Sequence, residues 1–151
     1  MDTIPEYLDS LKAKFASGSD WNEGLVALLE MADRLPPFAP ELKNEETRFH
    51  GCQSQIWLLL SHDPQSGRIL FAADSDARIV RGLLAIAQGY YQGRTPEEAA
   101  ACPPSMLRDA GLLDLLAPSR ANGFYRLLQH VHAFACEHAD EVKETGTWKQ
   151  S

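Results

Sequence analysis

The feature that constrains the fold most strongly is a change, in the middle of the chain, in the spacing at which apolar residues recur. Two short apolar runs, 55–60 and 68–73, are separated by the turn sequence Asp63-Pro64-Gln65-Ser66-Gly67. Such runs around a proline- and glycine-containing turn predict a β-hairpin. On both sides of the hairpin, apolar residues recur at the three- and four-residue spacing of amphipathic helices. We therefore expect an α+β domain in which helices flank one small antiparallel sheet.

Helix start and stop signals divide the segment before the hairpin. Thr3 and Asp20 are each followed three residues later by a glutamate, which predicts a capping box and a helix N-terminus at each position. Two prolines end the second helix, and the charged segment 36–47 is predicted to be a surface loop. A further strand is expected around 47–50, which would give the sheet about three antiparallel strands.

The segment after the hairpin is predicted to be helical. Ser75 or Asp76 is expected to cap a broad apolar helix that ends near Gly93. Thr95 is followed by proline and two glutamates, the pattern of a capped helix start. Another short helix is expected within 106–112, and a last one after Ser119, with a frayed polar tail after Asp140.

Composition sets limits on the class of protein. The 151 residues suit a single domain, and 14 basic against 21 acidic residues give a net charge of −7. Because no stretch concentrates the basic residues, we expect no nucleic-acid partner. The longest apolar runs, 56–60 and 69–73, are far shorter than the roughly 20 residues of a membrane helix. The first residues lack the features of a signal peptide, so we expect a cytoplasmic protein.

Cys52 is the strongest candidate for chemistry. It stands in the sequence Arg48-Phe49-His50-Gly51-Cys52-Gln53-Ser54-Gln55, immediately before the first strand of the hairpin. Gly51 permits a turn and leaves room for another molecule beside the sulfur. Backbone N–H groups and a nearby cation favour the thiolate, the form that attacks sulfur. From spacing alone, a packed small residue remains the alternative interpretation.

Other sites are weaker hypotheses. The odd number of cysteines, Cys52, Cys102 and Cys136, does not fit a disulfide framework. The spacings of His50 to Cys52 and of His132 to Cys136 allow zinc ligands, but no zinc-knuckle motif is present. A Cys-His hydrolase would need a base from among His130, His132 and His138, whose geometry the sequence does not fix.

The segment 48–57 strongly resembles the SufE family, the sulfur acceptors of cysteine desulfurases in iron–sulfur cluster assembly. The string Gly-Cys-Gln-Ser-Gln-Ile-Trp, residues 51–57, is the specific part of this match. The segments 74–83 and 116–123, together with Arg34-Leu35-Pro36, are similar to the same family in the same order. The resemblance covers roughly residues 5–138, and so a whole SufE-like domain within 1–151.

The resemblance implies a fold shared with IscU-type scaffold proteins and a persulfide on Cys52. The sulfur would come from a desulfurase of the SufS or CsdA type, which holds the pyridoxal phosphate, so no resident cofactor or metal is expected. The sulfur would pass to a SufBCD-type scaffold or another recipient. Cys102 and Cys136 fall outside the matching motifs. The residues expected to bind the partner or support the loop are Gly51, Gln53, Gln55, Asp74, Asp76 and Arg120.

Alternatives to the carrier are a desulfurase activator that carries no sulfur and a zinc-binding scaffold relative. Persulfide transfer needs an accessible thiolate but no acid–base dyad in the acceptor, so no independent turnover is expected. The sequence does not choose between the Suf and Csd branches. The net charge of −7 disfavours casual self-association but allows a specific homodimer.

Overall fold

The computed structural model describes residues 3–15, 21–50, 54–109, 111, 113 and 116–145. In this part of the chain, helices pack on a three-stranded antiparallel sheet, which confirms the expected α+β class. The strands, in spatial order, are β1 (Arg48–Phe49), β2 (Ile56–His62) and β3 (Ile69–Ser75). The helices are α1 (Ile4–Phe15), α2 (Trp21–Ala32), the 3₁₀ turn η1 (Pro40–Leu42), α3 (Arg78–Tyr91), α4 (Pro96–Ala100), α5 (Pro104–Arg108) and α6 (Pro118–Thr145).

The β2–β3 hairpin is the centre of the sheet. Its register pairs Ile56 with Ser75 at one end and His62 with Ile69 at the other. At the turn, the Asp63 carboxylate accepts a hydrogen bond from the Gln65 N–H at 2.8 Å. β1 extends the sheet by pairing with the first residues of β2, which confirms the expected third strand.

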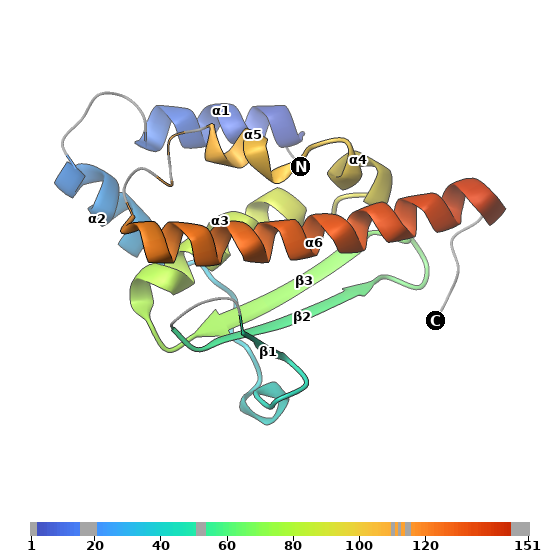
Figure 1. Cartoon of the computed structure of the whole chain (residues 1–151), viewed down its shortest axis with the longest axis horizontal. Coiled ribbons are helices and arrows are strands. Elements are labelled where there is room, and N and C mark those ends of the chain that lie inside the picture. The colour runs from blue at the N-terminus through green and yellow to red at the C-terminus, as the bar shows by residue number, and fades with distance from the viewer. Residues whose placement is uncertain are drawn as a thin grey trace.

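All the labelled helices lie on one side of the strands (Figure 1). α6 runs alongside β2 in the same direction, since Phe49 contacts His130 at 5.8 Å between ring centroids and His62 contacts His138 at 5.4 Å. The N-terminal end of α6 therefore lies at the end of the sheet where β1 joins β2. This is also the end from which the chain leaves β3 for α3 (Figure 1).

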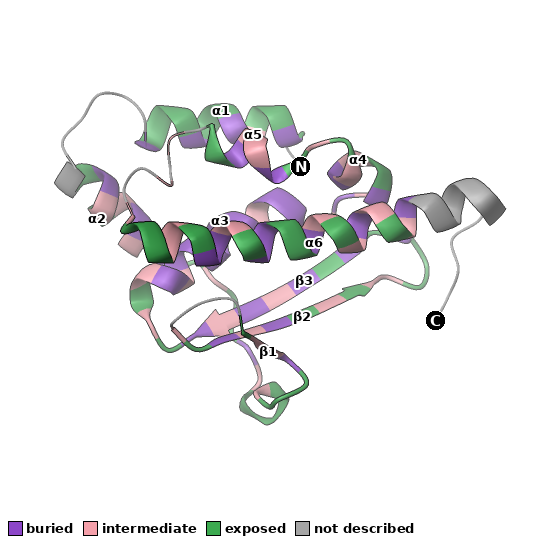
Figure 2. Ribbon diagram, in the orientation of Figure 1, coloured by how far each residue is buried: buried purple, intermediate pink, exposed green. Residues whose placement is uncertain are grey.

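The core forms between the inner face of the sheet and the helices. Alternate strand residues are buried there, among them Ile56, Phe71 and Ala73, and α3 is buried along most of its length (Figure 2). The buried tyrosines of α3 keep their hydroxyls satisfied, because Tyr91 donates to the Leu128 carbonyl at 3.1 Å. Burial without such an acceptor would cost about 1–3 kcal/mol.

Two helix starts differ from their predicted positions. The N-cap of α3 is Ala77, and neither Ser75 nor Asp76 caps it, because the Asp76 carboxylate accepts from the Gln55 N–H and the Ser75 hydroxyl donates to the Gln55 carbonyl. The Ser75 hydroxyl also accepts from the Ala77 N–H at 3.2 Å. α6 begins at Pro118, before the predicted cap Ser119, since a proline without an N–H fits the first helical position. The capping box at Thr95 is confirmed. Asp20 lies outside the described residues.

Two further boundaries were wrong at the carboxyl-terminal side. α6 continues past Asp140 to Thr145, beyond the point at which fraying was expected. The helix expected within 106–112 is α5, which begins earlier, at Pro104, and ends at Arg108. Pro104 takes the first helical position, and Gly111 has a φ of 89°, a conformation outside the helical region.

Replacing Gly82 with alanine tests the closest approach of two helices. A Cβ at this position would overlap the backbone carbonyl oxygen of Leu28 in α2, which cannot rotate away. We expect Gly82→Ala to lower the free energy of unfolding by about 2–3 kcal/mol, measured by urea denaturation. Gly89→Ala is the control, because its Cβ meets the end of the Tyr7 side chain and should cost less. Equal stability of Gly82→Ala and the wild type would contradict this packing.

Candidate functional site

The candidate site is the segment 50–55, which connects β1 to β2. Gly51, Cys52 and Gln53 lie outside the described residues, whereas the residues that flank them are described on both sides. Phe49 and Ile56 pair directly across the sheet, so the chain leaves and re-enters the sheet at one point. The structure therefore describes the two ends of this segment and the residues that contact them.

Gln55 is held by the residues that end β3. Its N–H donates to the Asp76 carboxylate at 3.0 Å, and its carbonyl accepts from the Ser75 hydroxyl at 2.6 Å. The Asp76 N–H donates to the same carbonyl at 3.3 Å. Both backbone polar groups of Gln55 are thus satisfied one residue before the β2–β3 ladder starts. Gln55 and Asp76 thus contact each other where the segment joins β2, and their role in supporting the loop stays a prediction.

Asp74 has different partners from Asp76. It pairs across the sheet with Trp57 and forms an ion pair with Lys43 at 2.9 Å and with Arg81 at 3.5 Å. Its carboxylate also accepts from the Ser75 N–H at 2.8 Å. Its side chain is only 18% exposed, so the two cations compensate a largely desolvated charge.

Lys43 and Arg81, which both pair with the Asp74 carboxylate, were not predicted from the sequence as site residues. Lys43 also lies over the Trp57 ring, with its Nζ 4.9 Å from the ring centroid. Arg48 faces the same side of the sheet, because it pairs directly with Trp57. The pairing of Arg48 with Trp57 could have been predicted from the strand register. No pattern in the sequence predicts that Lys43, a loop residue, lies over Trp57.

Arg120 is in the first turn of α6 and is half-buried. It precedes His130, the residue that contacts Phe49, by ten residues, or about 15 Å of helix. Because α6 runs with β2, this distance leads past the start of β2, to the end of the sheet that carries the segment 50–55. The structure thus places Arg120 at the same end of the molecule as Gln55 and Asp76. Its role as a partner-binding residue stays a prediction.

The remaining histidines and cysteines do not assemble a metal site within the described ranges. His50 is exposed and lies 3.4 Å from the Glu45 carboxylate. The Cys136 Sγ is 3.7 Å from the His132 Nε2, which is itself 3.0 Å from the Ala100 carbonyl. Across the described residues, no three His, Cys, Asp or Glu side chains are grouped closely enough to hold a metal ion.

Cys102 is a half-buried thiol whose surroundings oppose ionisation. Burial raises its pKa, and the neighbouring Glu98 carboxylate raises it further, while Arg94 acts in the opposite direction. A raised pKa reduces the fraction of thiolate at neutral pH and with it the rate of attack on sulfur.

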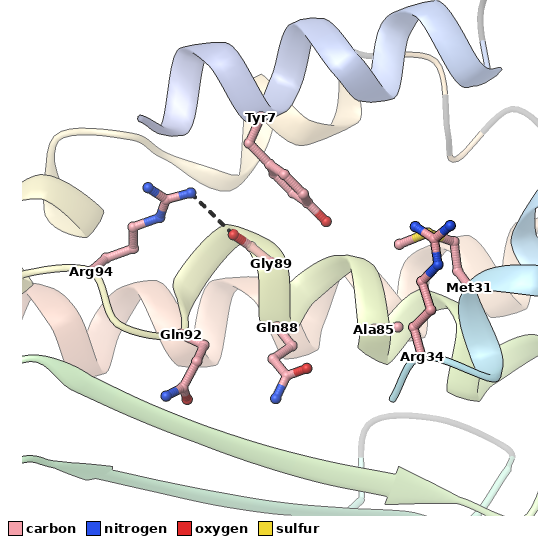
Figure 3. Close-up of a pocket in the computed structure, with 8 residues that line it drawn as sticks. All are labelled: Tyr7, Met31, Arg34, Ala85, Gln88, Gly89, Gln92 and Arg94. Atoms are coloured by element: carbon pink, nitrogen blue, oxygen red, sulfur yellow. Dashed lines mark hydrogen bonds between the residues drawn. The ribbon is translucent and has the colours of Figure 1, made fainter. Parts of the chain in front are cut away.

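A pocket of about 380 Å³ lies between α1, α2 and α3, and no residue of the segment 50–55 is among those that line it (Figure 3). Arg34 and Arg94 lie at opposite ends of it, with Tyr7 between them. Two of its polar side chains are engaged by the protein: the Tyr7 hydroxyl donates to the Ile86 carbonyl at 2.9 Å, and Arg94 donates to the Gly89 carbonyl at 3.1 Å.

Comparison with known proteins identifies the family. Residues 9–135 match the family described as SufE, Fe-S metabolism associated domain. The chain belongs to the SufE family. Its relatives include uncharacterized SufE-like proteins of Rhizobium etli, 34% identical over 82% of this chain and 86% of that protein, and of Synechocystis, 32% identical over 84% and 79%.

The fold of this SufE-family chain also matches a solved structure. The solution structure of a hypothetical protein from Thermus thermophilus superimposes with a TM-score of 0.70, at 22% identity, over 91% of this chain and 96% of that chain. The similarity supports the α+β fold. Of the described helices, none is long and apolar enough to cross a membrane.

Replacing Asp76 tests whether its carboxylate fixes the end of the SufE-motif segment. Asp76→Ala removes the acceptor of the Gln55 N–H, a hydrogen bond worth about 0.5–1.5 kcal/mol. We expect the Gln55 amide to exchange its hydrogen about three to ten times faster, measured by NMR, with the remaining β2 amides unchanged.

Asp63→Ala is the matched control, since it removes a carboxylate that accepts backbone N–H groups at the opposite end of the hairpin. It should accelerate exchange at Gln65 and Ser66 and leave Gln55 unchanged. An unchanged Gln55 amide in Asp76→Ala would show that the carboxylate does not fix this end of the segment.

Proposed function

We propose that this SufE-family protein is a sulfur acceptor and carrier, with Cys52 as the residue that receives the sulfur. The observation that carries the proposal is the string Gly-Cys-Gln-Ser-Gln-Ile-Trp at 51–57, inside a family match that spans residues 9–135. The family is associated with Fe–S metabolism. A cysteine desulfurase, whose pyridoxal phosphate remains in that enzyme, is the proposed sulfur donor.

The transfer is a thiol–persulfide exchange. The Cys52 thiolate attacks the terminal sulfur of a persulfide on the active-site cysteine of the desulfurase. A new S–S bond forms to Cys52, the S–S bond in the desulfurase breaks, and its electron pair stays on the desulfurase Sγ as a thiolate. The proton of the terminal sulfur is kept, so Cys52 leaves as a persulfide and no oxidant or reductant is consumed.

The ends of the segment that contains Cys52 support this function. The pairing of Phe49 with Ile56 and the hydrogen bonds between Gln55 and Asp76 hold both ends of the segment to the sheet. With both ends of the segment held in this way, a change of conformation between them would need no change in the core. Binding to the desulfurase would supply the differential free energy for such a change.

The other two thiols are less suited to the role. Burial and Glu98 raise the pKa of Cys102, which disfavours its thiolate. Cys136 lies between His130 and His138 along α6, and so further from the β1–β2 end of the sheet than His130 is. We therefore assign sulfur uptake to Cys52 alone and expect stimulation of the desulfurase to depend on it. A SufBCD-type scaffold is the proposed recipient of the sulfur.

Mass spectrometry after incubation with a desulfurase, pyridoxal phosphate and cysteine tests the assignment. Without reductant, the wild-type protein should gain one sulfur atom on the peptide that contains Cys52. The Cys52→Ser protein should gain none and keep the thermal stability of the wild type. Cys102→Ser and Cys136→Ser are the matched controls, and each should gain sulfur as the wild type does.

Three results would contradict the proposal that this protein carries sulfur on Cys52. Sulfur gain by Cys52→Ser would move the acceptor to another thiol. Full stimulation of the desulfurase by Cys52→Ser, with no sulfur on the wild type, would indicate an activator. One equivalent of zinc in the purified protein, with no sulfur gain, would indicate a scaffold.

A further inference from the structure

The face of the sheet away from the helices carries exposed apolar side chains. Strand alternation places Trp57 and Leu59 of β2, and Leu70 and Ala72 of β3, on this outer face, because the residues between them belong to the core. Leu59 is 39% exposed and Leu70 is 37% exposed. Leu59 pairs with Ala72, which is next but one to Leu70, so the apolar side chains form one continuous strip.

A cluster of cations borders this strip at the end where β1 joins β2. It consists of Lys43, Arg48 and Arg81, and the carboxylate paired with Lys43 and Arg81 is Asp74. With three positive charges and one negative charge, the cluster is locally positive on a chain whose net charge is −7. The register Arg48–Trp57–Asp74 places the cluster directly beside the aromatic end of the strip.

The charges of the two arginines of the cluster are unequally compensated. The Arg81 Nε lies 3.5 Å from the Asp74 Oδ1, in an ion pair that is too long for a good hydrogen bond. The Arg48 Nε is buried without a hydrogen-bond acceptor, and no ion pair joins Arg48 to another described residue. The positive charge of Arg48 is therefore left to be compensated by an external anion.

Because the apolar strip lies beside the arginines, the external anion is expected to be a carboxylate of a protein and not a small free anion. A free phosphate or carboxylate would use the arginines and leave Leu59 and Leu70 in water. A protein segment that carries a carboxylate beside apolar side chains would cover both. A second copy of this chain is disfavoured, because a two-fold contact would bring two positive clusters into one interface.

The position of the strip also relates it to the candidate sulfur site. Arg48 and Trp57 are the residues next to Phe49 and Ile56, between which the segment with Cys52 is anchored. A protein bound across Arg48 and Trp57 would therefore be held at the base of that segment.

We propose that this outer face, defined by Arg48, Trp57, Leu59 and Leu70 and bordered by Arg81 of α3, docks a carboxylate-bearing apolar segment of the desulfurase. The inference rests on the proposed function, because it takes the sulfur donor as the partner. It adds that Arg48 supplies the charge contact and Leu59 the apolar contact. The docking surface fixes the partner on the sheet, while the segment with Cys52 reaches its active site.

Binding of full-length variants to the desulfurase tests the surface. All proteins carry Cys52→Ser, so that affinity is measured by calorimetry without sulfur transfer. Arg48→Gln and Leu59→Ser should each raise the Kd about tenfold, and Arg48→Gln should also reduce the salt dependence of the Kd. The controls are Arg68→Gln, an exposed arginine at the other end of β3, and Val26→Ser, an exposed apolar residue of α2. Both controls should bind as the parent does.

The possible results distinguish a failure of the proposed docking surface from a failure of the proposed carrier function. Unchanged Kd values for Arg48→Gln and Leu59→Ser, with thermal unfolding like that of the parent, would overturn the surface and leave the carrier intact. A wild-type dimer in solution that Leu59→Ser dissociates would assign the face to a second copy and overturn the proposal. If the wild type neither binds the desulfurase nor gains sulfur, the proposed function itself fails.

Discussion

Gln55 immediately precedes β2, and the residues at the end of β3 hold both of its backbone polar groups. The hydrogen bonds to Asp76 and Ser75 continue the β2–β3 pairing by one residue through side chains. Because Phe49 pairs with Ile56 at the same point, the segment between them starts and finishes at one end of the sheet. The two ends of this segment are therefore held to the core by these few hydrogen bonds.

The inner face of the sheet stabilises the fold, and the outer face is the one that we expect to bind a partner. The inner face packs Ile56 and Phe71 against α3 and α6, so changes there are expected to alter folding. The outer face exposes Leu59 and Leu70 beside the Lys43–Asp74–Arg81 charges, so changes there should alter association instead. Strand alternation alone produces this separation, since successive side chains point to opposite faces.

Local patterns predicted the elements well, because the hairpin, the third strand and the Thr95 capping box each depend on neighbouring residues. The helix start at Ala77 was missed because Ser75 and Asp76 contact Gln55, about 20 positions earlier in the chain. The ion pair of Asp74 with Lys43 was missed for the same reason, since tertiary contacts decide which competing partner a polar side chain takes. The family resemblance indicated both Asp74 and Asp76. Only the structure shows that Asp74 pairs with Lys43 on the outer face, whereas Asp76 holds the Gln55 N–H.

The most direct test of the carrier is a single-turnover transfer from a desulfurase preloaded with a radiolabelled persulfide. The desulfurase, freed of excess cysteine, is mixed with one equivalent of this protein, quenched at short times and mapped by peptide. We expect the label to leave the desulfurase at the rate at which it appears on the Cys52 peptide. Label that leaves as free sulfide, or that stays on the desulfurase while the two proteins are bound, would contradict direct transfer to Cys52.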